Sequence, residues 1–135
     1  MKEEVAKRLY YLSLKAYRKG EVPVAAIIIK DNKIIAEAYN TRKSSFNPLY
    51  HAEIRAIIKA SKKLKDWRLS NCDLYVTLSP CHMCEEVIKE SRIRNTYYFL
   101  KNTKDINYKT SFLEMDNLYS KDFKDLLTNF FKIRR

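Results

Sequence analysis

The chain has 135 residues, of which 46% are hydrophobic, and this size and composition predict a single domain with its own core and argue against global disorder. Its formal net charge of +11 favours polyanionic partners such as nucleic acid, although the bias toward Lys, Ile, Asn and Tyr could equally come from an AT-rich genome. Three cysteines, an odd number, argue against a disulfide framework and favour a reducing cytoplasm, and we expect neither a signal peptide nor a membrane span.

The first half of the chain predicts one helix and a hairpin. Apolar residues at helical spacing indicate a helix over 2–19, which Gly20 ends. The apolar stretch 22–30 and the segment 33–39 are typical of two paired strands, joined by a tight turn at 31–32. The polar segment 40–48 ends in proline and predicts a loop.

The second half alternates between helices and strands. We expect a helix over 51–64, a strand over 72–78, a helix over 81–91, a strand over 95–100 and an aromatic, basic helix over 121–135. No element is assigned to 101–120. This order predicts an α/β domain in two or three layers. Its mixed sheet would be antiparallel at the hairpin and parallel across the strand–helix–strand unit.

A pair of cysteines opens the predicted helix 81–91. Cys81 and Cys84 are three residues apart, which brings both sulfurs onto one helix face, where the helix dipole favours thiolates. Alone, the pair fits a redox dithiol, half of a structural zinc site, or part of a catalytic zinc site. His51, at the start of the helix 51–64, is the available third ligand. Three protein ligands leave the fourth position for water, as in catalytic zinc sites.

Glu53 lies two residues after His51, so it can share the pocket while pointing in another direction. A carboxylate beside a zinc-bound water can take its proton and return it to a leaving group. The combined pattern H-x-E…P-C-x-x-C is that of the zinc-dependent nucleobase deaminases. We expect Cys72 to be a small core residue, because as a fourth ligand it would close the site. Trp67 and Leu69 are expected to pack under a loop.

Five stretches of the chain occur in the order and at the spacing of the cytidine deaminase-like superfamily. They are EVPVAAIIIKDNKIIAEAYN, NPLYHAEIRAI, DLYVTLSPCHMC, SRIRNTYYF and FFKIRR. Within it, the chain most resembles the bacterial tRNA-specific adenosine deaminases. The resemblance implies a three-layer α/β/α fold with a central mixed sheet, as one CMP/dCMP-type domain over 1–135. It also implies one Zn²⁺ per subunit, a cytoplasmic homodimer, and deamination of adenosine to inosine at the wobble position of a tRNA anticodon stem-loop.

The same resemblance assigns roles to individual residues. It implies His51, Cys81 and Cys84 as zinc ligands and Glu53 as the proton shuttle. Asn40 matches the residue that hydrogen-bonds the target base, and Asn102 stands at a position that commonly meets the RNA backbone. Contacts with RNA are also expected from Phe130, Phe131 and Arg134, because aromatic rings stack on splayed bases and arginine binds phosphate. The chain departs from the family pattern at Ser79, where Glu is usual, at Tyr50, which replaces a small residue, and in a shortened connector over 103–120.

Three alternatives remain open from the sequence. A deaminase of a free nucleobase or nucleoside, such as guanine, cytosine or cytidine, would share the zinc chemistry but would not need the positive charge. A thiol–disulfide oxidoreductase would use Cys81 and Cys84, but a thioredoxin-like fold normally has a cis-proline after the motif, and every proline here precedes Cys84. A zinc module that binds RNA without turnover is the third.

Overall fold

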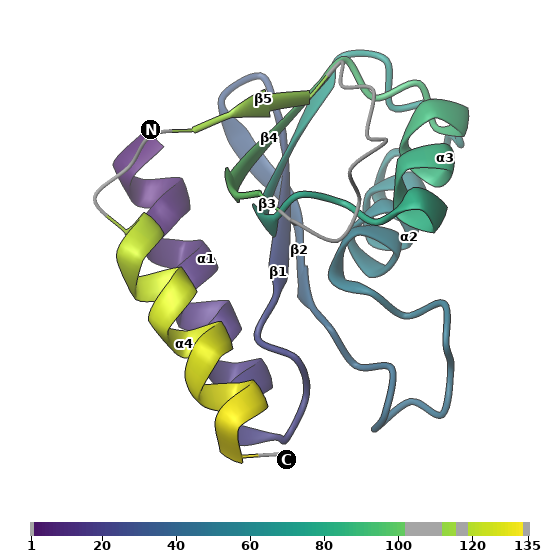
Figure 1. Ribbon diagram of the computed structural model, residues 1–135. Coiled ribbons are helices and arrows are strands. Elements are labelled where there is room, and N and C mark those ends of the chain that lie inside the picture. The colour runs from purple at the N-terminus through teal and green to yellow at the C-terminus, as the bar shows by residue number, and fades with distance from the viewer. Residues whose placement is uncertain (1, 102–111, 116–118, 134–135) are drawn as a thin grey trace.

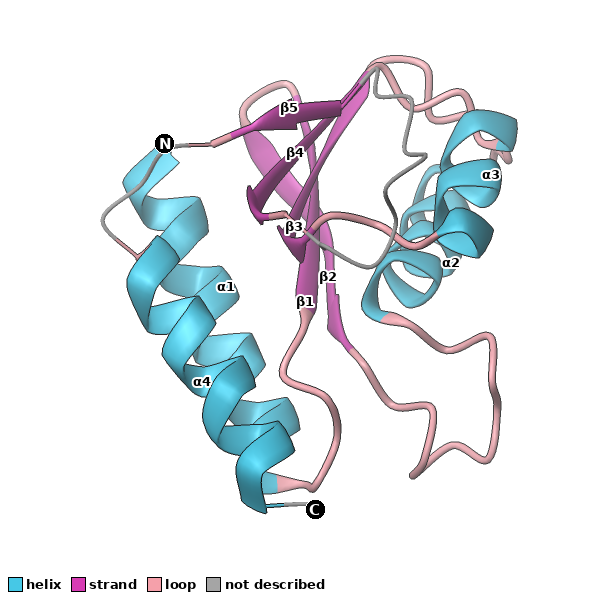
Figure 2. Cartoon of the chain, in the orientation of Figure 1, coloured by secondary structure: helices cyan, strands magenta, loops and turns pink. Residues whose placement is uncertain are grey.

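The protein is a sheet with helices on both faces. The computed structural model describes residues 2–101, 112–115 and 119–133. The elements are α1 (Lys2–Arg18), β1 (Ala25–Lys30), β2 (Lys33–Tyr39), α2 (Ala52–Leu64), β3 (Cys72–Leu78), α3 (His82–Glu90), β4 (Asn95–Leu100), β5 (Phe112–Glu114) and α4 (Ser120–Ile133). Helices α1 and α4 lie side by side on one face, and α2 and α3 cover the other (Figures 1 and 2). The predicted three-layer α/β/α fold is confirmed.

The sheet is mixed, as predicted, with the strand order β2-β1-β3-β4-β5. Strand β1 is antiparallel to both β2 and β3, whereas β3, β4 and β5 run parallel to one another. Asp31 and Asn32 close the hairpin with positive φ angles of 50° and 61°, which a two-residue type I′ turn requires. Strand β5 was not predicted, because it has three residues and lies in the segment to which no element was assigned.

Alternate residues of β1 enter two separate cores, because successive side chains of a strand point to opposite faces. Ala26 and Ile28 pack in the core under α2 and α3. Ile27 and Ile29 pack in the core under α1 and α4, where Phe123 of α4 is fully buried. Cys72 is a buried member of the first core, as predicted. Both helical layers are therefore fixed to the same central strand.

One prediction about the surface is wrong. Trp67 was expected to pack under a loop, but its side chain is 59% exposed. The guanidinium groups of Arg68 and Arg92 lie over its indole ring, at 5.6 and 5.7 Å from the ring centroid. These cation–π contacts stabilise the ring at the surface without burying it. Leu69 is buried as expected. Within the described residues, no helix has the length and apolar character needed to cross a membrane.

Candidate metal centre and adjoining groove

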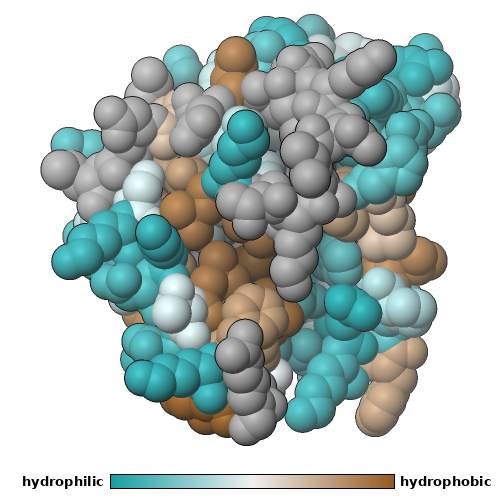
Figure 3. Space-filling view, in the orientation of Figure 1, coloured by the Kyte–Doolittle hydropathy of each residue, from teal (hydrophilic) through white to brown (hydrophobic). Residues whose placement is uncertain are grey.

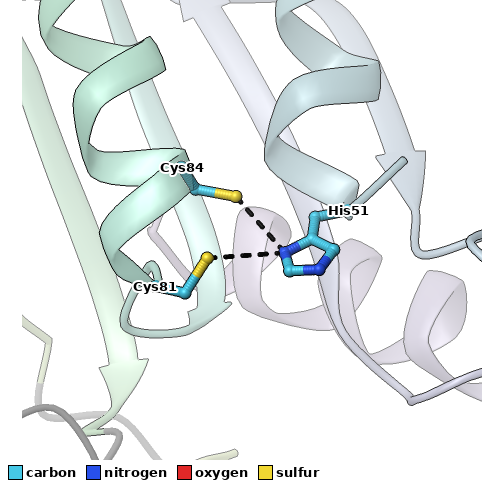
Figure 4. A group of neighbouring side chains, drawn as sticks. All are labelled: His51, Cys81 and Cys84. Carbon is cyan, nitrogen blue, oxygen red and sulfur yellow. Dashed lines mark hydrogen bonds between the residues drawn. The ribbon is translucent and has the colours of Figure 1, made fainter. Parts of the chain in front are cut away.

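Three metal-binding side chains converge where α2 and α3 begin (Figure 4). His51 is the N-cap residue of α2, Cys81 is the N-cap residue of α3, and Cys84 lies in the first turn of α3. His51 Nδ1 is 3.6 Å from Cys81 Sγ and 3.4 Å from Cys84 Sγ. In the part of the chain that the structure describes, no other group of three such side chains gathers in this way.

The backbone at the two helix starts directs these side chains toward each other. His51 and Cys81 both have extended backbone, with φ/ψ of −67°/159° and −71°/173°. An N-cap side chain often bonds back to the N–H groups of its own helix. Neither residue does so here. The imidazole and the thiol therefore face across the gap between α2 and α3, as Figure 4 shows.

The distances fit zinc. A tetrahedral zinc with sulfur at ~2.3 Å and nitrogen at ~2.0 Å places the ligand nitrogen and each sulfur ~3.5 Å apart. The two nitrogen–sulfur distances in the cluster, 3.4 and 3.6 Å, match this separation. The chemistry of the donors, two sulfurs and one imidazole, is also that of zinc sites. The predicted ligand set is thus brought together in a geometry that could hold the ion.

Hydrogen bonds and burial within the cluster shift the pKa values of all three side chains. Hydrogen bonds from Cys84 and His51 lower the pKa of Cys81 to about 4. The hydrogen bond to Cys81 raises the pKa of His51, and the hydrogen bond to Cys81 together with burial raises the pKa of Cys84. A bound cation would replace the protons on these groups, because metal binding requires deprotonated ligands and releases protons.

Glu53 lies in the wall of a cavity of about 130 Å³ beside the cluster. Its side chain is only 4% exposed, and burial raises the pKa of its carboxyl group. Among the described residues that line this cavity, Glu53 is the one carboxylate; the others are Val22, Val24, Asn40, Arg42, His51, Ala52, Leu78, Ser79 and Cys81. A buried carboxyl group beside a group of metal-binding side chains is an arrangement suited to proton transfer.

Asn40 also lines the cavity, in a fixed orientation. Its backbone N–H donates to the carbonyl oxygen of Val24 at 3.0 Å, and its side-chain Oδ1 accepts the backbone N–H of Arg42 at 3.1 Å. Ser79, at the position where the resemblance leads one to expect Glu, is buried in the same wall. The backbone N–H of Ser79 donates to the carbonyl oxygen of Leu100 at 2.7 Å, which joins the segment between β3 and α3 to the end of β4.

A second hollow, here called the outer groove, adjoins the cavity and has a volume of about 560 Å³. Its walls are the loop after β2 and the end of α4, and its lining residues are Gly20, Glu21, Val22, Asn40, Arg42, Lys43, Phe46, Asn47, Pro48, Phe130 and Phe131. Val22, Asn40 and Arg42 line both hollows, so the groove leads to the cavity. In the same orientation as Figure 1, the space-filling view shows apolar surface in the middle of the molecule, beside α4 (Figure 3).

The predicted RNA contacts are located only in part. Phe130 and Phe131 line the outer groove, with Phe130 buried and Phe131 49% exposed. Asn102 and Arg134 lie outside the described residues. The groove wall also contains four residues to which the sequence assigned no role: Glu21, Arg42, Lys43 and Phe46. The last three lie in the polar loop 40–48, where no motif marked their side chains.

Comparison with known proteins gives one family and a consistent set of relatives. A family model described as the cytidine and deoxycytidylate deaminase zinc-binding region matches residues 1–100. The tRNA-specific adenosine deaminases of Rickettsia bellii and Bacillus subtilis are 43% and 42% identical to the chain over 91 and 84 residues. These alignments cover 66% and 62% of this chain, but only 63% and 52% of the relatives, so the match spans little more than half their length.

Two solved structures are similar over most of the chain. One comes from work on A-to-I editing by tRNA:A34 deaminases at the wobble position of transfer RNA. It has a TM-score of 0.77 and 28% identity, and the match covers 85% of this chain and 100% of that one. The other, a guanine deaminase from Bacillus subtilis, has a TM-score of 0.71 and 28% identity, and the match covers 94% and 93%.

Proposed function

Because the chain belongs to the cytidine and deoxycytidylate deaminase family, we propose that it converts adenosine to inosine at the wobble position of a tRNA anticodon. The observation that carries this proposal is the His51–Cys81–Cys84 cluster with buried Glu53 in the adjoining cavity wall. The choice of tRNA as substrate is supported by the relatives at 42–43% identity and by the net charge of +11. We take residues 1–135 as one deaminase domain.

The three clustered side chains are proposed to hold one zinc ion per chain, through His51 Nδ1 and the two sulfurs. When bound, zinc acts as a Lewis acid and lowers the pKa of a bound water to near neutrality. The described cluster contributes three ligands, and Cys72 lies in the hydrophobic core as a free cysteine. A fourth position is thus left for water, which distinguishes a catalytic from a closed structural site.

Glu53 is proposed to move the protons of the reaction. It takes one proton from the attacking water, whose oxygen bonds to C6 of adenine, and passes that proton to ring N1. It then takes the second proton from the hydroxyl group now on C6 and passes it to the amino group. The C6–N bond breaks, ammonia leaves, and adenosine has become inosine. A general acid–base works best when its pKa is near the operating pH. The burial that raises the pKa of Glu53 acts in that direction.

The remaining parts of the substrate are assigned to side chains around the cavity. Asn40, held by its bond to the N–H of Arg42, is proposed to hydrogen-bond the target base. Phe130 and Phe131 in the outer groove are proposed to contact the RNA, because aromatic rings stack on splayed bases. We include Arg134 as a further RNA contact because arginine binds phosphate, and Asn102 on the resemblance alone. A cytoplasmic homodimer is also proposed on the resemblance alone.

A guanine deaminase is the second candidate. It is favoured by the 28% identical guanine deaminase structure, whose match covers 94% of this chain. The cavity of about 130 Å³ is lined by one arginine and no lysine among the described residues, so it needs no charged substrate. The same zinc and the same Glu53 would serve both reactions. The two candidates differ in the ring carbon attacked, C6 of adenine or C2 of guanine, and in whether the groove and the positive surface are used.

The deciding experiment is a comparison of substrates. The zinc-loaded protein is incubated with an anticodon stem-loop carrying a wobble adenosine, and separately with free guanine, adenosine and cytidine. Products are identified by mass spectrometry, with Glu53→Ala as the inactive control. Inosine in the stem-loop, with little turnover of the free compounds, supports the proposal. Turnover of guanine alone would replace it with the second candidate, and no turnover of any substrate would overturn both.

A further inference from the structure

We propose that the outer groove binds the nucleotide next to the target adenosine, with the base of that nucleotide stacked on Phe46. The inference rests on the proposed RNA substrate and extends it from the target base to its neighbour. It makes the loop 41–48 a second recognition element beside the cavity.

Phe46 has two unfavourable features: its apolar side chain is exposed to water, and its backbone has a positive φ angle. Its side chain is 94% exposed, the largest exposed fraction among the bulky apolar side chains of the described residues. Its backbone has φ 51°, in the left-handed region that is unfavourable for residues with a Cβ atom. Strained backbone of this kind clusters at functional sites. A base lying on the ring would remove its apolar face from water and offset the cost of these features.

The loop that carries Phe46 is fastened to the rest of the protein by a buried carboxylate. Glu21, 3% exposed, accepts the backbone N–H of Lys43 at 3.1 Å and of Ser44 at 2.6 Å. Burial opposes ionisation of Glu21, but these hydrogen bonds outweigh it and lower its pKa. Within the loop, the N–H of Asn47 donates to the carbonyl oxygen of Arg42 at 3.0 Å. The backbone that carries the ring is therefore held in place before any ligand arrives.

The lining of the groove matches the chemistry of a single-stranded nucleotide. Arg42 and Lys43 supply positive charge for a phosphate, and Phe46 supplies a flat apolar face. Proteins bind single strands through this combination of cations and stacking aromatic rings. The volume of about 560 Å³ is in the range of small-ligand sites. Because Asn40 and Arg42 line both hollows, a nucleotide here would be adjacent to the base in the cavity.

The test measures stacking directly, without turnover. The RNA is the anticodon stem-loop, with fluorescent 2-aminopurine placed on one side of the wobble adenosine or on the other. The protein is the zinc-loaded Glu53→Gln variant, which binds without converting the substrate. Binding should quench the label at one of the two positions. Adding Phe46→Ala should restore the fluorescence and weaken binding about tenfold, or about 1.4 kcal/mol, whereas Phe46→Tyr should preserve both.

A matched control is Trp67→Ala, which removes an exposed aromatic ring outside the groove. It should leave RNA affinity unchanged. In the enzyme with Glu53 intact, Phe46→Ala should raise KM for the stem-loop about tenfold and leave kcat nearly unchanged. That split is expected for an interaction made equally in the ground state and the transition state.

The outcomes separate this inference from the proposed function. If the unsubstituted enzyme neither binds nor converts the stem-loop, the proposed function fails. If it converts the stem-loop and Phe46→Ala binds RNA as tightly as the parent, the proposed function stands and the stacking inference is overturned. Analytical ultracentrifugation tests whether a second copy of the chain, and not RNA, binds this surface. A shift from dimer to monomer in Phe46→Ala would show that a second copy of the chain covers the ring, which also overturns the inference.

Discussion

Replacing Glu53 with Gln separates proton transfer from metal binding. The substitution keeps the size and shape of the side chain but removes its ability to accept and return a proton. A positioned general acid–base typically contributes 10²–10⁴-fold to a rate. Since no second carboxylate that could replace it lines the cavity among the described residues, we expect kcat to fall about 10³-fold, or about 4 kcal/mol. Zinc content should stay at one ion per chain.

The same substitution should change how the stability of the metal-free protein depends on pH. Burial raises the pKa of Glu53 in the folded state above its unfolded value. The stability that this group contributes is therefore complete below the unfolded pKa of about 4.3 and is lost as the pH rises through the folded pKa. Glutamine does not titrate. The stability of Glu53→Gln relative to the parent should thus increase from pH 4 to pH 8.

Three measurements check this reasoning. Elemental analysis gives the zinc content, single-turnover assays give the rate, and urea denaturation of EDTA-treated protein at several pH values gives the free energy of unfolding. A variant without zinc would show that Glu53 is a ligand. A variant with a rate within tenfold of the parent would show that another group moves the proton. A stability difference independent of pH would contradict the buried, titrating carboxyl group.

Further expectations concern the metal ligands and the scaffold. Cys84→Ala should lose zinc and activity together, as measured by elemental analysis and inosine formation. In the metal-free protein at pH 6, iodoacetamide should label Cys81 before the other cysteines, since hydrogen bonds from Cys84 and His51 lower its pKa to about 4. Peptide mass mapping identifies the labelled cysteine, and bound zinc should protect Cys81 from the reagent. The Arg8 guanidinium lowers the pKa of Glu37, so in urea titrations the parent should lose stability relative to Glu37→Gln as the pH falls below about 4.5. Phe123→Ala, at a fully buried site, should cost about 3–5 kcal/mol in the same assay.

Local patterns were enough to predict most of the fold. The run of apolar residues over 22–30 predicted a buried strand, and β1 is indeed buried on both faces. The Asp31–Asn32 turn predicted the hairpin, because these residue types accept positive φ. Strand β5 could not be predicted, because three residues are too few to show a period and their pairing with β4 depends on the finished sheet. The exposure of Trp67 likewise depends on Arg92, which is distant in sequence.

The sequence predicted the residues of the metal cluster but not those of the outer groove. Spacing predicted that Cys81 and Cys84 lie together, and the H-x-E pattern pointed to His51 and Glu53 as their partners. In the structure His51 clusters with both cysteines, and His51, Glu53 and Cys81 line one cavity. The groove wall was not predictable. Its loop is held by Glu21 through backbone N–H groups more than twenty residues away. Backbone donors are the same at every residue except proline, so such a contact leaves no trace in the sequence.

Because the proposed zinc ligands are far apart in the sequence, zinc should affect how much of this protein a cell contains. His51 and Cys81 come from different helices and meet only in the folded state. An ion that binds the folded chain alone shifts the folding equilibrium by mass action, and at 100 times its dissociation constant it adds about 2.7 kcal/mol. Zinc starvation would then lower the surviving amount of this protein through degradation of its unfolded form, as well as the activity of each remaining molecule.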